Sequence, residues 1–460
     1  MSDHKSKKVV KRVKTGAIER RFSMAKAGVF AGAKFATQTA ATVFSNKEDR
    51  ERKQKEILSN QAQYLADELG KLKGSIVKVG QMLALWGEHF LPKEVTDALH
   101  TLEDDTAIVQ WPVMRAELEK YLGRDKLMDL DIDPDPIGAA SLGQVYLATR
   151  KTDGKQICLK IQYPGVATAI DSDLDAVAQL LKVTRVVPFT QEFEEWLEEI
   201  RAMMNREVDY ELELRTTARF KKFLEKDSRF IVPEVYPEYS SSNVIATEYQ
   251  PGHVLNSDVV LNLSQERRNA IGEACLDLCW QEVFNWGEMQ TDPNFGNYFV
   301  RLGENGDSDK IILLDFGAVR KFTPETLVPG KKLILGSYLH DKSMLRQAML
   351  ELRFMTDDFP DDVFETFTEL CFLAMEPFSD LEKFPPPAEY LNEDGAYIWE
   401  KSNLASRALV KASKSAASKH FAVPPKELMF LSRKLIGAFT LMSVISAEIK
   451  GQPLLAKYVD

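Results

Sequence analysis

The fold is decided by the sequence Gln-Thr-Asp-Pro-Asn-Phe-Gly-Asn at residues 290–297, read together with Leu-Leu-Asp-Phe-Gly at residues 313–317. In the first stretch, four residues separate Asp292 from Asn297. The carboxylate of Asp315, in the second stretch, and the amide oxygen of Asn297 are hard oxygen ligands of the kind that Mg²⁺ prefers. Asp292 supplies a further carboxylate, which can orient or deprotonate an attacking hydroxyl or water. The two stretches therefore predict Mg²⁺-assisted phosphoryl chemistry around Asp292.

This order of residues is the one found in protein kinases, in which Asp-x-x-x-x-Asn of the catalytic loop precedes Asp-Phe-Gly. A plain turn between a helix and a strand is the alternative for residues 290–297, because Asp-Pro and Gly-Asn also mark turns. The surrounding pattern favours the kinase-like interpretation. An apolar helix is expected over residues 266–286, and an apolar strand over residues 311–314 ends beside Asp315.

A glycine-containing loop and a lysine-bearing strand lie upstream, in the order that a kinase has them. Residues 138–145 match the kinase pattern Gly-x-Gly-x-x-Gly-x-Val, except that Ala140 replaces the middle glycine. Strands are expected over residues 144–149 and 156–162, and Lys160 lies among apolar neighbours in the second. A lysine in such a place is costly unless it meets an anion, and a nucleotide phosphate is one. Period-two alternation puts Cys158 on the same face as Lys160.

An acidic cluster follows on a helix expected over residues 191–226, after an extra helical segment at residues 166–190. Its members are Glu207, Asp209, Glu211 and Glu213. The cluster offers a partner for Lys160, and a solvated acidic face is the alternative. Residues 231–237 and 243–248 are expected to be strands, with Glu248 and Tyr249 starting the hinge between two lobes. Beyond residue 317 the pattern is helical, apart from a break at the prolines of residues 385–387.

A long amphipathic helix is expected over residues 65–90, where Lys78 and Gln81 share one face. Its two glycines each cost about 1 kcal/mol relative to alanine, which indicates close approach of another backbone or a ligand. A surface Lys–Gln pair beside a packing glycine is the alternative. Pro134 and Pro136 are expected to break the chain at a domain boundary.

Composition limits the classes of protein to consider. The chain has 460 residues, 44% of them hydrophobic, and its net charge of −10 argues against general nucleic-acid binding. Its four cysteines form no Cys-x-x-Cys pair, which fits a reducing cytoplasmic compartment and no cysteine metal site. Residues 1–21 are strongly basic, and such a tail either lies on an anionic membrane surface or stays solvated. We expect no signal peptide and no membrane-spanning helix.

Together these motifs resemble the UbiB (AarF-domain) family of atypical kinase-like proteins, and within it the coenzyme-Q biosynthesis branch. The matching stretches are Lys-x-Gly-Gln at 78–81, an alanine-rich loop at 139–141, Glu-x-Asp at 207–209, Gln-Thr-Asp-Pro-Asn at 290–294 and Leu-Asp-Phe-Gly-Ala at 314–318. The resemblance implies an α+β, protein-kinase-like two-lobe fold with a small β-containing N-lobe, a helical C-lobe and an added N-terminal helical layer. The expected division is a basic tail and linker at 1–60, a helical extension at 61–130, an N-lobe at 131–250 and a C-lobe at 251–460.

The resemblance also implies a role for each candidate residue. ATP or ADP, with Mg²⁺, would be the cofactors. Lys160 would hold the α- and β-phosphates and be oriented by Glu213, Asp292 would position the nucleophile, and Asn297 and Asp315 would hold the metal. The remaining candidates are the nucleotide contacts Gly138, Ala139, Ala140, Ser141, Cys158, Glu248 and Tyr249, and the gating residues Lys78, Gln81, Glu207 and Asp209. Gly138 and Cys158 depart from the family, in which alanine is usual at both places.

The function expected from the resemblance is that of an ATP- and Mg²⁺-dependent atypical kinase or ATPase. It would support ubiquinone (coenzyme Q) or related isoprenoid-lipid biosynthesis at a membrane surface, as a peripheral protein on the inner side. Expected partners are a nucleotide, an isoprenoid lipid or quinone precursor, an anionic membrane surface and a biosynthetic enzyme complex. Two alternatives remain open, a nucleotide-switched lipid-binding scaffold and a conventional Ser/Thr protein kinase.

Overall fold

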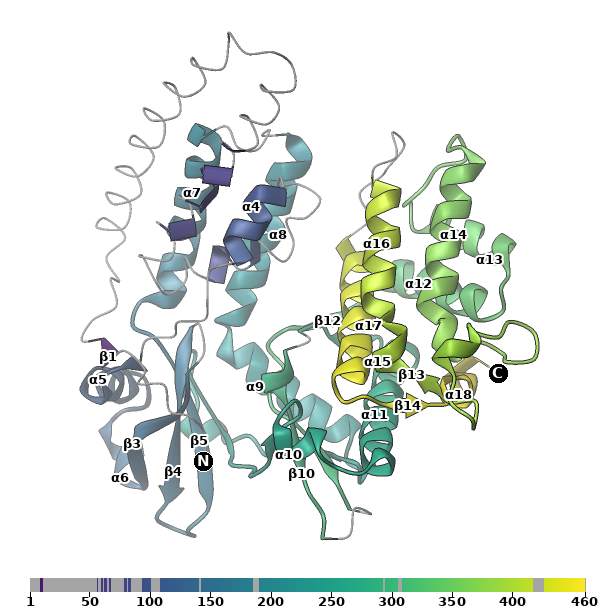
Figure 1. The fold of residues 1–460 in the computed structure, drawn as a ribbon. Helices are drawn as coiled ribbons and strands as arrows, with labels where there is room; N and C mark the ends of the chain where they lie inside the picture. Colours follow the sequence, from purple (N-terminus) through teal and green to yellow (C-terminus); the bar gives the residue numbers. More distant parts are fainter. Residues whose placement is uncertain are drawn as a thin grey trace. The chain divides into compact units, whose positions relative to one another are not determined.

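The computed structural model describes residues 9–10, 56, 59–60, 62–63, 66–67, 78–80, 82–83, 93–100, 108–139, 142–184, 190–292, 294–304, 308–416 and 426–459. The chain folds into two compact units (Figure 1). The N-terminal unit comprises Met1–Arg215 and Glu234–Tyr249, and the C-terminal unit comprises Thr216–Pro233 and Gln250–Asp460. The finer division of the chain at residues 60, 130 and 250 stays a prediction.

An antiparallel sheet forms the centre of the N-terminal unit. Its strands are β3 (Leu130–Ala139), β4 (Gly143–Arg150), β5 (Gln156–Gln162) and β7 (Val244–Glu248), in the order β3-β4-β5-β7. The strands predicted over residues 144–149, 156–162 and 243–248 are therefore present. The predicted break at Pro134 and Pro136 is wrong, because β3 runs through both prolines, with register shifts on either side of Pro136. β3 is an edge strand, where a residue without an N–H is tolerated.

The described part of the N-terminal unit also contains several α-helices and one small strand pair. They are β1 (Val9–Val10), α4 (Lys93–His100), β2 (Ile108–Val109), α5 (Trp111–Leu122), α6 (Arg124–Met128), α7 (Val166–Thr184) and α8 (Gln191–Glu207), with the first part of α9 (Tyr210–Phe223). Arg201 of α8 joins α7 through Asp171 at 3.0 Å and Asp175 at 2.7 Å. Most of the basic tail and most of the helix predicted over residues 65–90 lie outside the described residues.

The single helix predicted over residues 191–226 is wrong, because two helices, α8 and α9, occupy that stretch. At the break, the carbonyl of Val208 accepts a hydrogen bond from the buried side chain of Gln162 at 2.6 Å. The side chain of Asp209 then accepts the N–H of Leu212 at 2.9 Å, as an N-cap does. The acidic cluster is thus divided, with Glu207 ending one helix and Glu213 lying in the first turn of the next.

The strands of the C-terminal unit carry the segments that contain Asp292 and Asp315. β6 (Phe230–Ile231), β11 (Lys310–Leu313), β10 (Tyr298–Arg301) and β8 (His253–Val254) form one sheet in that order, and β9 (Glu288–Gln290) pairs with β12 (Val319–Lys321). Of the strand predicted over residues 231–237, only Ile231 belongs to a regular strand. Pro233 and Pro237 lack backbone N–H groups, so they cannot continue a ladder.

Helices make up most of the rest of the C-terminal unit (Figure 1). They are α10 (Asp258–Leu261), α11 (Gln265–Trp280), the π-helical segment η2 (Gln281–Trp286), α12 (Pro324–Tyr338), α13 (Lys342–Glu351), α14 (Asp361–Met375), α15 (Trp399–Ser402), α16 (Leu404–Ala416), α17 (Lys426–Val444) and α18 (Gly451–Val459). Two short strands, β13 (Tyr397–Ile398) and β14 (Glu448–Ile449), interrupt the helical pattern predicted for this region. No helix in the described part of the chain is both long and apolar enough to cross a membrane.

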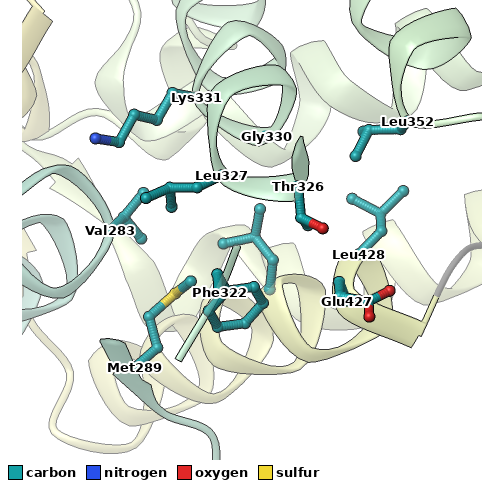
Figure 2. A pocket seen from close by; sticks show the side chains of 11 residues that line it. Val283, Met289, Phe322, Thr326, Leu327, Gly330, Lys331, Leu352, Glu427 and Leu428 are labelled. Carbon is teal, nitrogen blue, oxygen red and sulfur yellow. The ribbon is translucent and has the colours of Figure 1, made fainter. Parts of the chain in front are cut away.

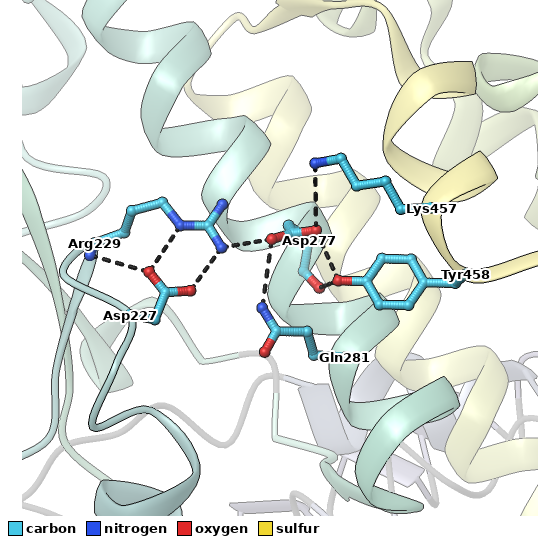
Figure 3. A network of polar contacts seen from close by, with 6 residues as sticks. All are labelled: Asp227, Arg229, Asp277, Gln281, Lys457 and Tyr458. Carbon is cyan, nitrogen blue, oxygen red and sulfur yellow. Dashed lines mark hydrogen bonds and ion pairs between the residues drawn. The ribbon is translucent and has the colours of Figure 1, made fainter.

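A buried carboxylate ties the last helix to the centre of the C-terminal unit (Figure 3). Asp277 of α11 is 5% exposed, and it accepts a hydrogen bond from Tyr458 of α18 at 2.8 Å. Arg229, which also pairs with Asp227, reaches the other oxygen of Asp277. Because Asp277 is paired on both sides, α18 and the strand region before β6 are both fixed to α11.

A small apolar pocket lies where α12 and α17 meet η2, β9 and the residue that follows β12. Figure 2 shows the side chains that surround it, and they are Val283, Met289, Phe322, Thr326, Leu327, Gly330, Lys331, Leu352, Glu427, Leu428 and Leu431. The ammonium group of Lys331 points away from the pocket and donates to the carbonyl of Phe284 at 2.8 Å. The lining is therefore almost entirely apolar.

We expect Gly330→Ala to stabilise the protein by about 1 kcal/mol, because alanine is the better helix former and its methyl group would enter the pocket. The nearest atom to the added Cβ would be Leu431 Cδ2, at the ordinary contact distance of 3.7 Å. Gly336→Ala in the same helix is the matched control, since its Cβ would lie 3.2 Å from the backbone nitrogen of Leu345. Urea unfolding should show a gain for the first variant and a smaller gain or a loss for the second. Equal effects of the two would show that the pocket offers no room.

Candidate active site

The predicted phosphate-binding lysine meets its predicted glutamate in the N-terminal unit. Alternation along β5 buries Ile157, Leu159 and Ile161 completely and leaves Lys160 on the opposite face. Both carboxylate oxygens of Glu213 contact the Lys160 ammonium, at 2.9 and 3.0 Å. The Glu213 side chain is 5% exposed and that of Lys160 is 22% exposed. Glu213 therefore fixes the ammonium at the edge of solvent, where an anion can reach it.

Where β3 leads into β4, the chain requires glycine at one position and tolerates a side chain at another. A Cβ on Gly143 would lie 2.4 Å from the carbonyl oxygen of Ile161, so only glycine allows this approach of β4 to β5. At Gly138 a Cβ would only touch Val145 at 3.8 Å, so the alanine usual in the family would also fit. Ala139 ends β3 opposite Gln144, whereas Ala140 and Ser141 lie outside the described residues.

The other predicted nucleotide contacts lie on β5 and at the end of β7. Cys158 shares the face of Lys160, and burial raises the pKa of its thiol to about 12, so the group is neutral at physiological pH. Glu248 pairs with Ile157 in the sheet, and the N–H of Tyr249 donates to the carbonyl of Gln156 at 3.0 Å. The sheet thus fixes the backbone at the start of the predicted hinge.

Of the predicted gating residues, Lys78 and Glu207 form an ion pair at 2.9 Å, and both side chains are about a quarter exposed, at 23% and 24%. Asp209 caps α9 through Leu212. Gln81 lies outside the described residues. The pair joins the segment around residue 78 to the C-terminal end of α8, and the gating role of these residues stays a prediction.

Asp292, Asn297 and Asp315 come together in the C-terminal unit. The Asn297 amide nitrogen donates to Asp292 Oδ2 at 2.8 Å, and the Asn297 carbonyl accepts the N–H of Leu314 at 3.1 Å. Asp315 follows directly, and its carboxylate accepts the N–H of Gly317 at 2.9 Å. Phe316 is buried and packs on Phe220, with ring centroids 4.8 Å apart. Packing therefore fixes the segment that carries Asp315.

The donor set fits a hard divalent cation. The contact with Asp292 uses the Asn297 amide nitrogen, so the amide oxygen is not engaged in it, and both this oxygen and the Asp315 carboxylate are ligands of the kind that Mg²⁺ prefers. Among the described residues there is no group of three or more His, Cys, Asp or Glu side chains that could hold a metal. One carboxylate and one amide oxygen fill only part of the coordination sphere of a metal ion. Such a site suits Mg²⁺, which keeps water and phosphate oxygens among its ligands.

A second layer of residues, which the motifs did not predict, holds this loop. Gln290 accepts the N–H of Asp292 at 3.1 Å and donates to the carbonyl of Asp315. The carboxylate of Glu282, in η2, accepts the N–H of Gln290 at 3.2 Å and contacts the ammonium of Lys434 of α17. Arg433, the neighbour of Lys434, lies with its guanidinium 3.7 Å from Asp292 Oδ1. The sequence gives only a weak indication of these contacts. Glu282 is a glutamate inside an apolar helical segment, and Arg433 and Lys434 are two cations that precede an apolar run.

The comparisons with known proteins place the chain among atypical kinases. Residues 101–349 match the model of the ABC1 atypical kinase-like domain. The probable serine/threonine-protein kinase abkA of Dictyostelium discoideum is 29% identical over 84% of this chain and 68% of its own length. The mitochondrial atypical kinase COQ8 of Saccharomyces cerevisiae is 28% identical over 84% and 73%, and COQ8B of Danio rerio is 31% identical over 84% and 59%.

A solved structure agrees on the fold. Rv3197 of Mycobacterium tuberculosis, in its complex with erythromycin, matches with a TM-score of 0.56 at 21% identity over 90% of this chain and 98% of that one. The fold is kinase-like α+β, with an antiparallel β N-lobe and a helical C-lobe, as the motifs predicted. Because the family model covers more than half of its 460 residues, this chain belongs to the ABC1 (UbiB) family of atypical kinase-like proteins.

Proposed function

We propose that this protein is an ATP- and Mg²⁺-dependent atypical kinase or ATPase. The observation that carries the proposal is the ion pair between Lys160 and Glu213, in which a buried carboxylate orients a half-buried ammonium with both of its oxygens. Such a lysine binds nucleotide phosphates in kinases. Membership of a kinase-like family, which implies nucleotide binding, supports the same conclusion.

The proposed roles follow from the chemistry of each side chain. Lys160 would neutralise phosphate charge, and Asp315 and Asn297 would hold Mg²⁺, which supplies Lewis-acid stabilisation of the transferred phosphoryl group when bound. Asp292 would orient the attacking hydroxyl or water and accept its proton. Its carboxylate is fixed for this by the amide of Asn297 at 2.8 Å.

We further propose that the activity supports ubiquinone or related isoprenoid-lipid biosynthesis at a membrane surface. The support is the likeness to relatives named as COQ8 atypical kinases, at about 30% identity, and the resemblance of the motifs to that branch of the family. The basic tail at residues 1–21 would supply attraction to anionic lipid. The second candidate function is that of a Ser/Thr protein kinase, because the relative abkA is named a probable serine/threonine-protein kinase.

The test is phosphate release from Mg-ATP by the full chain, with and without vesicles that contain anionic lipid, beside the Asp292→Ala variant. We expect turnover that rises with vesicles and falls by at least about 10²-fold in the variant, as is typical when a general base is removed. Vesicle binding without any phosphate release would favour the scaffold. Efficient, Asp292-dependent phosphorylation of added proteins would favour the protein kinase.

A further inference from the structure

Helix α17 brings two adjacent cations to the loop that carries Asp292. Lys434 is buried, at 7% exposure, and its ammonium contacts the buried carboxylate of Glu282. Arg433 is 24% exposed and lies with its guanidinium 3.7 Å from Asp292 Oδ1. The two residues thus reach the same loop in two ways, one through Glu282 and the other directly.

The contact through Lys434 is a continuous chain of polar groups. One carboxylate oxygen of Glu282 contacts the ammonium of Lys434, and the other accepts the N–H of Gln290 at 3.2 Å. Gln290 in turn binds the N–H of Asp292 and the carbonyl of Asp315 with the two ends of its side-chain amide. This chain fixes the backbone of both segments, whereas the Asp292 carboxylate is held by other residues, Asn297 among them.

Arg433 acts on that carboxylate. Asn297 donates to Oδ2 of Asp292 at 2.8 Å, and Arg433 lies on the side of Oδ1 at 3.7 Å. Asn297 thus donates a hydrogen bond to one carboxylate oxygen, and the Arg433 guanidinium lies at ion-pair distance from the other oxygen, where it stabilises the negative charge. Orientation of this kind matters because a reacting group displaced by about 1 Å can cost roughly 10²-fold in rate.

We propose that Arg433 is a positioning residue for the reaction, which orients Asp292 from helix α17 while Lys434 and Glu282 anchor the loop beneath it. This inference rests on the proposed role of Asp292. A purely structural role for Arg433 is a weaker explanation, because Arg433 and Asp292 are 24% and 35% exposed, and ion pairs at such exposure contribute only about 0–1 kcal/mol to stability.

The experiment compares the full-length wild-type chain with Arg433→Ala, Arg433→Lys and Asp292→Ala. The control is Arg346→Ala, which removes an arginine from a carboxylate pair at 2.8 Å on the exposed face of α13. The measurements are kcat and KM for Mg-ATP, the rise in melting temperature with Mg-ADP, and amide hydrogen exchange of the peptide over residues 288–297. The exchange measurement reports on the loop even when no turnover is found.

For Arg433→Ala we expect kcat to fall about 10- to 100-fold with KM and the Mg-ADP effect nearly unchanged. Exchange over residues 288–297 should stay close to that of wild type, because Lys434, Glu282 and Gln290 still hold the backbone. Arg433→Lys should restore part of kcat, and Arg346→Ala should match wild type. Clearly faster exchange in Arg433→Ala would overturn the inference, because Arg433 would then hold the loop and not the carboxylate. A normal kcat for Arg433→Ala beside an inactive Asp292→Ala would overturn the inference and leave the proposed function standing. A change in KM alone would also overturn it, because Arg433 would then act on the substrate.

If instead Asp292→Ala turns over like wild type, the proposed function fails on its own account. The inference then fails with it, because Arg433 is proposed to act on the reaction through Asp292.

Discussion

Asp315→Asn should remove the Mg²⁺-dependent part of nucleotide binding and, with it, phosphate release. The amide keeps the shape of the side chain, and its oxygen can still accept the N–H of Gly317, which Asp315 accepts at 2.9 Å. The backbone carbonyl that Gln290 contacts is also untouched. What is lost is the negative charge that a divalent cation requires, and metal stabilisation of a developing phosphoryl charge is worth several kcal/mol. Turnover should therefore fall by about 10³-fold or more.

The binding part of this prediction can be measured by melting temperature. A ligand at about 100 times its Kd stabilises the folded state by roughly 2.7 kcal/mol, so Mg-ADP should raise the melting temperature of wild type clearly and that of Asp315→Asn hardly at all. Asp361→Asn is the matched control, since it makes the same change of charge on a side chain that is 93% exposed. An Mg-ADP effect of wild-type size in Asp315→Asn would remove Asp315 from the metal site.

Lys434→Met should destabilise the protein by about 3–5 kcal/mol, because it leaves the carboxylate of Glu282 buried and without its cation. Burial alone would lower the pKa of Lys434, but the contacting Glu282 carboxylate more than offsets this and raises it, so the ammonium stays charged. Burial raises the pKa of the Glu282 carboxyl, whereas Lys434 and the N–H of Gln290 act in the opposite direction, so the loss of Lys434 removes the main group that keeps Glu282 ionised. Urea unfolding at neutral pH measures the loss.

The double variant Glu282→Gln with Lys434→Met should recover most of that stability, because no charge remains buried and glutamine still offers an oxygen to the N–H of Gln290. Lys457→Met is a suitable control. Its side chain is 56% exposed and only 3.9 Å from Asp277, so its loss should cost less than about 0.5 kcal/mol. A double variant as unstable as Lys434→Met would show that packing, not charge, explains the loss.

Features with a strong local pattern could be predicted from the sequence. The alternation of residues 156–162 gave the bounds of β5 and put Cys158 and Lys160 on one face, because each second side chain must enter the core. The order of the motifs then predicted a kinase-like fold. A strand lysine, an acidic helix and two loops with aspartates follow one another along the chain in this order in few folds. Glu213 is the member of the acidic cluster that contacts Lys160 in the structure.

The features that could not be predicted depend on residues that are far away in the sequence. The break between α8 and α9 is decided by Gln162 on a distant strand, which no helical periodicity can show. The support of the Asp292 loop comes from α17, more than a hundred residues later, through a lysine that looks like an ordinary surface cation in sequence. The sequence could have predicted that β6 is short, because Pro233 and Pro237 lack the N–H groups that a longer strand ladder needs.

The π-helical segment η2 has a consequence for aligning this chain with its relatives. A π-turn holds one residue more than an α-helical turn, so the chain after it is rotated by about 100° relative to an uninterrupted helix. Here that rotation is followed by Gly287, with a φ of +63°, and then by Gln290, whose N–H reaches back to Glu282. A relative that lacks one residue within 281–286 would align with a gap of a single position. Its counterpart of Glu282 would face another direction, and its catalytic loop would need an anchor from elsewhere.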